Sequence, residues 1–105
     1  METIARGVTG RNGVREAASV ELPNSYTINY TSGIDGVERS FYLSNGEIWY
    51  DPDTSISSNE ISIAKNVETF NVTNGNLINI NLVTQDTIRD KVLRVFLYTQ
   101  IKLRN

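Results

Sequence analysis

The dipeptide Asn45-Gly46 separates two short runs of alternating apolar and polar residues, and it constrains the fold more than any other feature. Asn-Gly is the strongest short-range signal for a two-residue β-turn, because both turn positions need a positive φ. The pairs expected across this turn are Leu43 with Ile48, Tyr42 with Trp49, and Phe41 with Tyr50. Alternation then places the first and last of these pairs on one face and the Tyr–Trp pair on the other. The sequence therefore predicts a β-hairpin from two strands, Glu38–Ser44 and Glu47–Asp51.

A second Asn-Gly, Asn74-Gly75, calls for a different turn. A two-residue turn would place Ile78 and Ile80 on the face opposite Phe70, whereas a one-residue change in register returns them to it. A three-residue loop over Thr73-Asn74-Gly75, with Gly75 left-handed, pairs Phe70 with Ile78. The residues that then share one face are Phe70, Val72, Ile78, Ile80 and Leu82. We therefore expect the three-residue loop.

Three further strands are expected from alternation, at residues 25–31, 59–65 and 91–103. The last is the longest, and both of its faces are partly apolar. One face carries Leu93, Val95 and Leu97, and the other carries Phe96 and Tyr98 among polar residues. Two apolar faces favour a central strand that is covered on one side by a helix.

The only candidate helix covers residues 2–22, with Gly13–Glu21 as its strongest part. Alanine and arginine favour helix there, while Pro23 disfavours helix at Leu22 and ends the segment. We therefore predict an α+β fold: one domain over residues 1–105, with this helix packed on a single antiparallel sheet built from residues 25–103.

Composition excludes several functional classes. The chain has 105 residues, with 12 acidic and 10 basic side chains, and a net charge of −2, so no basic footprint for nucleic acid is expected. It contains no His, which removes the usual general base at neutral pH, and no Cys, which removes thiol nucleophiles and thiolate metal sites. We expect a protein that is not an enzyme and needs no cofactor or metal.

A resemblance to a known family extends over most of the chain. The segments 13–18, 26–30, 41–50, 63–72 and 78–82 occur in the order found in type IV pilin-like proteins, and the chain closes on Leu103-Arg104-Asn105. The closer likeness is to minor pilins and minor pseudopilins of type IV pili, type II secretion and competence systems. The leader, peptidase site and long apolar helix of that family are absent from this sequence, which therefore resembles only the globular part.

The resemblance implies a structural subunit of the cell surface, anchored in the membrane through an apolar segment that precedes these residues. It would assemble with other pilin or pseudopilin subunits through its N-terminal helix, whose outer face carries Arg11 and Arg15. Two alternatives stay open. One is a β-rich module that binds carbohydrate or another surface partner, and the other is a structural subunit of a phage or virion.

Three groups of side chains are candidate sites. Residues 51–60 place oxygen ligands at alternating positions, as calcium loops do, but Ile56 and Ser62 stand where a helix–loop–helix calcium site needs Gly and Glu. A polar turn is therefore expected. The carboxylate pairs Asp51/Asp53 and Asp86/Asp90 are expected to be solvated.

The third group is aromatic. Tyr42, Trp49, Phe96 and Tyr98 either form an exposed strip that binds a glycan or a partner, or lie in the core beneath the helix. Because aromatic side chains dominate buried area, we expect the core.

Overall fold

The structure is a computed structural model that describes residues 13–74 and 77–102. Its elements in chain order are a short 3₁₀ turn η1 (Val14–Glu16), β1 (Ala17–Asn24), β2 (Thr27–Ser32), β3 (Glu38–Ser44), β4 (Glu47–Asp51), β5 (Ile61–Ala64), β6 (Val67–Asn74), β7 (Ile78–Ile88) and β8 (Lys91–Ile101). The described part of the chain is therefore all-β, apart from one 3₁₀ turn.

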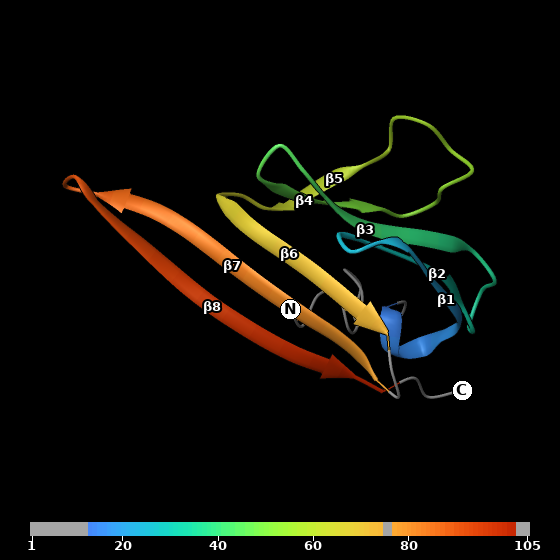
Figure 1. Ribbon diagram of the computed structural model, residues 1–105. Coiled ribbons are helices and arrows are strands. Elements are labelled where there is room, and N and C mark those ends of the chain that lie inside the picture. The colour runs from blue at the N-terminus through green and yellow to red at the C-terminus, as the bar shows by residue number, and fades with distance from the viewer. Residues whose placement is uncertain (1–12, 75–76, 103–105) are drawn as a thin grey trace.

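The strands form two antiparallel sheets (Figure 1). Sheet A has the order β1-β2-β3-β4-β5, and sheet B has the order β6-β7-β8, so each is a simple meander. Strand β6 lies against sheet A: the Val72 N–H donates to the Ser25 carbonyl at 2.6 Å, and the Val67 N–H donates to the Gly46 carbonyl at 2.8 Å. The predicted α+β fold with one sheet is thus wrong, because a second sheet covers the face that a helix was expected to cover.

The predicted helix over residues 2–22 is wrong wherever the structure describes it. Residues 1–12, including Arg11, lie outside the described part. Beyond them only Val14–Glu16 make a 3₁₀ turn, and Ala17 begins a strand. Val14 and Ala17 are fully buried, so packing into the core overrides the local helix propensity of the alanines. Pro23 fits β1 because β1 is an edge strand, where a missing N–H costs no ladder bond.

The predicted hairpin at Asn45-Gly46 is confirmed. Both residues have positive φ, 50° and 75°, as the turn requires. The observed pairs are Leu43 with Ile48, Tyr42 with Trp49, and Phe41 with Tyr50. The strand expected at 59–65 appears as β5, and that at 25–31 appears as β2.

The core lies between the two sheets. Sheet A contributes a row of stacked rings in which the Tyr30 and Phe41 centroids are 5.8 Å apart and the Phe41 and Tyr50 centroids are 4.9 Å apart. Offset stacking at these separations adds to the burial of apolar area. Sheet B contributes the buried residues Val67, Phe70, Val72, Ile78, Ile80, Leu82 and Ile101. The five residues expected to share one face of the second hairpin, Phe70 to Leu82, are all among them.

The loop of that second hairpin differs from the prediction. Asn74 pairs with Ile78 and Phe70 pairs with Leu82, so the strand β6 continues through Thr73 and Asn74. The expected pair, Phe70 with Ile78, is wrong. Both registers put the same residues on the same face, because they differ by an even number of residues. The conformation of Gly75 lies outside the described residues.

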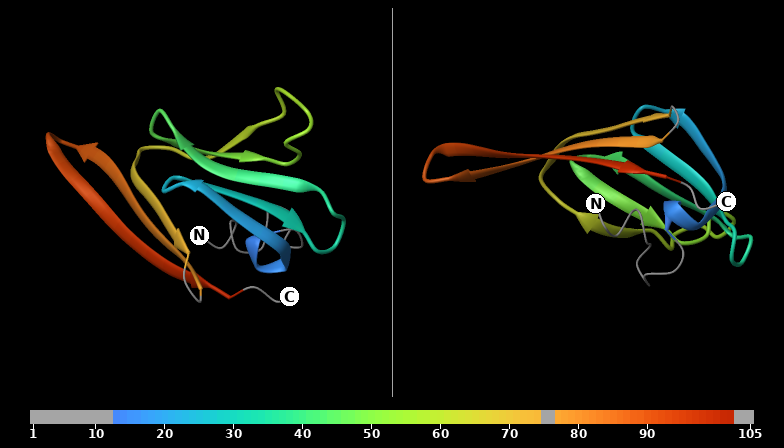
Figure 2. Two further views of the ribbon diagram at one scale, coloured as in Figure 1. Left: turned by 45° about the vertical axis from the view of Figure 1, so that its right-hand side comes forward. Right: turned by 90° about the horizontal axis from the view of Figure 1, so that it is seen from below.

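The prediction for the last strand is also wrong. β8 is an edge strand of sheet B and pairs only with β7 among the described residues. Figures 1 and 2 show that the β7–β8 hairpin runs well beyond sheet A on one side. We call the projecting part, residues 84–98, the arm. Its two apolar faces therefore reflect a lack of cover, and not burial between two layers.

Candidate functional site

The loop 51–60 is organised by its own hydrogen bonds. The Asp51 carboxylate accepts the Asp53 N–H at 3.1 Å, and Asp53 accepts both the N–H and the hydroxyl of Ser55, at 3.0 and 2.6 Å. The Ser55 bonds hold the pKa of Asp53 below its usual range, while burial raises the pKa of Asp51. Among residues 13–74 and 77–102, no three acidic side chains converge as a metal site requires. These oxygens cap turns, as expected of a polar loop.

The pair Asp86/Asp90 lies on the arm and is exposed. Asp86 accepts the N–H of Thr87 at 2.9 Å, and Asp90 occupies the turn between β7 and β8 with a positive φ of 64°. Neither carboxylate lies in a buried pocket beside a second charged group, which is the arrangement that acid–base catalysis uses.

The four aromatic residues are divided between the two sheets, and none of them is in the core. Tyr42 and Trp49 face each other across β3 and β4 on the outer face of sheet A, where both are half-buried. Phe96 and Tyr98 lie on β8 and are 74% and 60% exposed. The expectation of a shared core position is therefore wrong, and so is a single continuous strip.

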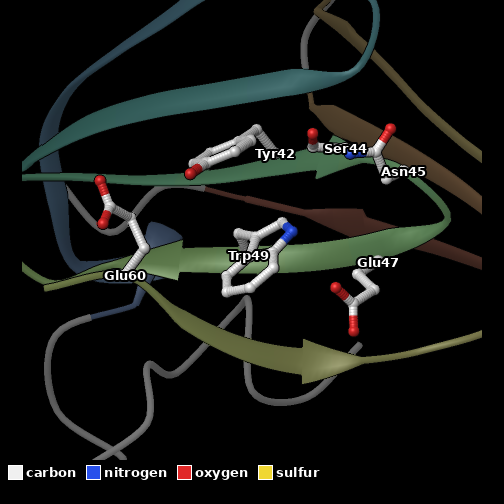
Figure 3. A pocket seen from close by; sticks show the side chains of 6 residues that line it. All are labelled: Tyr42, Ser44, Asn45, Glu47, Trp49 and Glu60. Atoms are coloured by element: carbon white, nitrogen blue, oxygen red, sulfur yellow. The ribbon is translucent and has the colours of Figure 1, made fainter. Parts of the chain in front are cut away.

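Tyr42 and Trp49 line a shallow groove of about 270 Å³, together with Ser44, Asn45, Glu47 and Glu60. Figure 3 shows the two rings side by side on one face, with Glu60 near one end and Glu47 near the other. Burial is the main cause that raises the pKa of Tyr42, and the negative charge of Glu60 adds to it. The groove thus combines two aromatic faces with carboxylates at its ends.

A small polar cluster lies on the outer face of sheet B, next to the base of the arm. The Tyr98 hydroxyl donates to the Asn79 side-chain oxygen at 3.0 Å, and the Gln100 amide donates to that oxygen at 3.0 Å and to the Tyr98 hydroxyl at 2.8 Å. Farther along, Arg94 forms an ion pair with Glu68 of β6 at 2.7 Å. These contacts draw the side chains of β8 back across β7, away from the free edge of the strand.

On the inner face of the arm, β8 presents an uncovered apolar row, beside Thr84 and Asp86 of β7. Leu82 of β7 is buried under sheet A, but its partner Leu97 is 42% exposed, and beyond it Val95 and Leu93 are more than half exposed. This row continues the core face of sheet B past the point where sheet A ends. It borders a groove of about 380 Å³ whose opposite wall includes Lys65 and Asn66. Contiguous exposed apolar surface of this kind marks interaction sites.

The free edge of β8 has few of the features that protect edge strands, and its only charges are Lys91 and Arg94. β8 pairs with β7 over eleven consecutive residues without a bulge. The segment Val95–Ile101 contains no charge, Pro or Gly. Natural edge strands are normally shortened, bent or charged, because an unpaired edge is a template for another strand.

The arm was missed by sequence reasoning, although the signal was present. The alternation in 91–103 predicts a central strand that is covered on one side by a helix, but an edge strand that projects beyond its cover has the same alternation. The structure also shows that no helix in the described ranges is long and apolar enough to cross a bilayer.

Comparisons with models of known protein families, with curated proteins and with solved structures gave no match. The proposals below therefore depend on the geometry of this chain alone.

Proposed function

We propose that the protein is a non-enzymatic structural subunit that joins a larger protein assembly through the β7–β8 arm. The observation that carries this proposal is the uncovered apolar row Leu93, Val95 and Leu97, which extends the core face of sheet B beyond the body. Apolar side chains that continue a core face past its cover are suited to contact with a neighbouring subunit.

An assembly role was also the main expectation from the pilin resemblance, but the associating element differs. That expectation assigned assembly to a helix over residues 2–22, and the described part of this segment is a 3₁₀ turn followed by β1. The proposal keeps the role of a structural subunit and moves the contact to the arm. Among the alternatives, a structural subunit of a phage or virion is compatible with an all-β body that carries a projecting hairpin.

The test replaces the three inner-face residues by threonine, as Leu93→Thr, Val95→Thr and Leu97→Thr together. Threonine keeps a high β-propensity, so the hairpin should persist while its apolar surface is lost. Tagged chains are expressed in the cell that naturally makes the protein. Their entry into high-mass assemblies is measured by density-gradient sedimentation. We expect wild type to sediment with assemblies and the triple variant to remain in the light fractions.

A matched control carries Ile34→Thr and Ile56→Thr, which remove apolar groups that are 58% and 53% exposed in loops of sheet A. This control should assemble as wild type does. Normal assembly of the triple variant, or wild type confined to the light fractions, would show that the arm is not an assembly element.

The aromatic groove supports a second candidate function, the binding of a carbohydrate. The faces of Tyr42 and Trp49 offer a platform for the apolar face of a pyranose ring, and Glu47 and Glu60 can accept hydrogen bonds from its hydroxyls. Trp49 is the only tryptophan, so its fluorescence reports on this groove alone. Titration with soluble oligosaccharides should change the emission of wild type, and Tyr42→Ala should abolish the change. Unaltered emission across a panel of neutral and charged oligosaccharides would refute this candidate.

A further inference from the structure

We propose that the partner of the arm is a second copy of this chain, which pairs its β8 strand antiparallel with β8 about a two-fold axis at Val95. This inference rests on the proposed assembly role of the arm and adds the identity of the partner and the register. The result would be one six-stranded sheet that is continuous through both copies, with the two bodies at opposite ends.

The first argument is the state of the backbone at the edge. Alternate residues of a strand direct their N–H and C=O groups to opposite sides, and β8 has a neighbour on one side only. Three outer-face side chains of β8 are held away from the open side, because Arg94 contacts Glu68, and Tyr98 and Gln100 contact Asn79. A second strand can therefore approach without displacing these side-chain contacts of β8.

The second argument is that the sequence of β8 complements itself in one register. A two-fold axis perpendicular to the sheet places each inner-face residue opposite an inner-face residue of the other copy. The axis therefore lies between the two copies of one residue, which names the register. With the axis at Val95, Leu93 lies opposite Leu97 of the second copy, and Val95 lies opposite its own counterpart. All three apolar residues of the inner row then contact apolar residues.

Charge also favours this register. Arg94 lies opposite Phe96 of the second copy, so this pair brings no two like charges together. Moving the axis to Tyr98 would bring Arg94 opposite Lys102, and like charges directly opposite each other are destabilising. The axis at Val95 avoids every such pair between Lys91 and Thr99.

The reach of the arm is the third argument. With the axis at Val95, Lys91 of one copy lies opposite Thr99 of the other, so the overlap covers residues 91–99. It ends before Ile101, which is 1% exposed and belongs to the body. The overlap therefore uses the hairpin that projects beyond sheet A (Figure 2) and leaves the buried end of β8 in place.

The first test uses charge at position 96 in the full-length purified chain. In the proposed register, Phe96→Lys places a lysine opposite Arg94 of the second copy at two symmetric positions, whereas Phe96→Glu places a glutamate there. We expect wild type to dimerise in sedimentation velocity, Phe96→Lys to raise the dimer Kd by about tenfold or more, and Phe96→Glu to stay close to wild type. Equal weakening by the two substitutions would overturn the register, because loss of an aromatic contact alone does not depend on the sign of the charge.

The second test uses cysteine, and the chain has none of its own to interfere. With a short bis-maleimide, Val95→Cys should cross-link to itself. Leu93→Cys and Leu97→Cys should each cross-link poorly alone but efficiently when the two proteins are mixed. Efficient self-cross-linking of Leu93→Cys would place the axis elsewhere and overturn the proposal.

The two proposals fail separately. If the purified chain stays monomeric at all concentrations up to about 1 mM, where contacts weaker than about 4 kcal/mol go undetected, the second copy is not the partner. The assembly role would nevertheless stand if the inner-face triple variant were still excluded from assemblies in the cell. Far-UV circular dichroism and thermal melting of each variant verify that it folds.

Discussion

Strands β1 and β8 are both edge strands, each at the end of a sheet, but they are built in opposite ways. β1 contains Pro23 and Glu21, and its pairing with β2 shifts register twice, at Ala17/Ser19 and at Glu21/Asn24. β8 is regular over its whole length and has no charge, Pro or Gly between residues 95 and 101. β1 combines proline, charge and irregular register, whereas β8 carries only two charges, Lys91 and Arg94, in its N-terminal part.

This difference shows where the chain tolerates an open edge. Proline, charge and irregular register are the devices by which natural sheets avoid edge-to-edge association. Proline and irregular register are present in β1 and absent from β8, so the contrast between the two edges is informative. The same strand also carries the uncovered apolar row, and both features favour contact at β8.

The largest expected effect is the difference in stability loss between substitutions at the two ends of β8. Ile101→Ala removes a side chain that is 1% exposed in the core and should lower the free energy of unfolding by about 2–5 kcal/mol. Leu93→Ala, at a position that is 51% exposed, should lower it by less than about 1 kcal/mol. Urea denaturation of both variants, at a protein concentration well below the dimer Kd, measures the two values. Similar losses at both positions would mean that the arm is covered within a single chain.

A second prediction concerns the turn between β2, which is the partner strand of β1, and β3. The β2–β3 turn is closed by Asp35 and Arg39, whose two side-chain hydrogen bonds are 3.0 and 2.7 Å long. These bonds, with one from the Val37 N–H, hold the pKa of Asp35 well below its usual value. The stabilisation is therefore complete above the ordinary Asp pKa of 3.8 and declines as the pH falls below it.

The test is Asp35→Asn, which removes the charge but keeps the shape of the side chain. The variant should melt at a lower temperature than wild type at pH 7. The difference between the two melting temperatures should narrow as the pH is lowered from 4 to about 2. Asp86→Asn, in the exposed arm, serves as the control and should show a smaller gap. A gap for Asp35→Asn that is constant with pH would contradict the role of the ion pair.

The smallest expected effect tests the protection of β1. Pro23→Val should change the free energy of unfolding by less than about 1 kcal/mol, because Pro23 is exposed and its benefit arises largely from restricting the unfolded chain. Restoring an N–H at this edge should nevertheless increase association slightly in a background where Phe96→Lys has closed the β8 edge. Sedimentation velocity of the double variant measures this association. If association does not change, the two register shifts are sufficient protection.

The sequence predicted those parts of the fold that are decided by neighbouring residues. The pairs around Asn45-Gly46 followed from the turn and from alternation, and so did the position of Tyr42 opposite Trp49. The face shared by Phe70 and Leu82 was also predictable, but the loop between their strands was not. Two registers that differ by an even number of residues bury the same side chains, so the apolar pattern could not distinguish them.

The errors arose where distant parts of the chain decide the structure. Val14 and Ala17 are in the core because of what packs against them, and local propensity favoured a helix there. The alternation of Leu93, Val95 and Leu97 is the same whether a strand lies beneath a covering layer or projects beyond it. The candidate aromatic residues were identified, but their division between two sheets depends on how the sheets are arranged, which no local pattern encodes.

The meander connectivity of both sheets has a consequence for how the chain forms its structure. Every strand pairs with the strand before it or after it in the sequence, so no pairing waits for a distant segment. Chains with such local contacts fold faster than other β proteins of similar size. During synthesis, all five strands of sheet A leave the ribosome before β6, and β8 is the last of the eight described strands to follow. The edge strand β8 thus emerges when most of the described body that holds it has already been made.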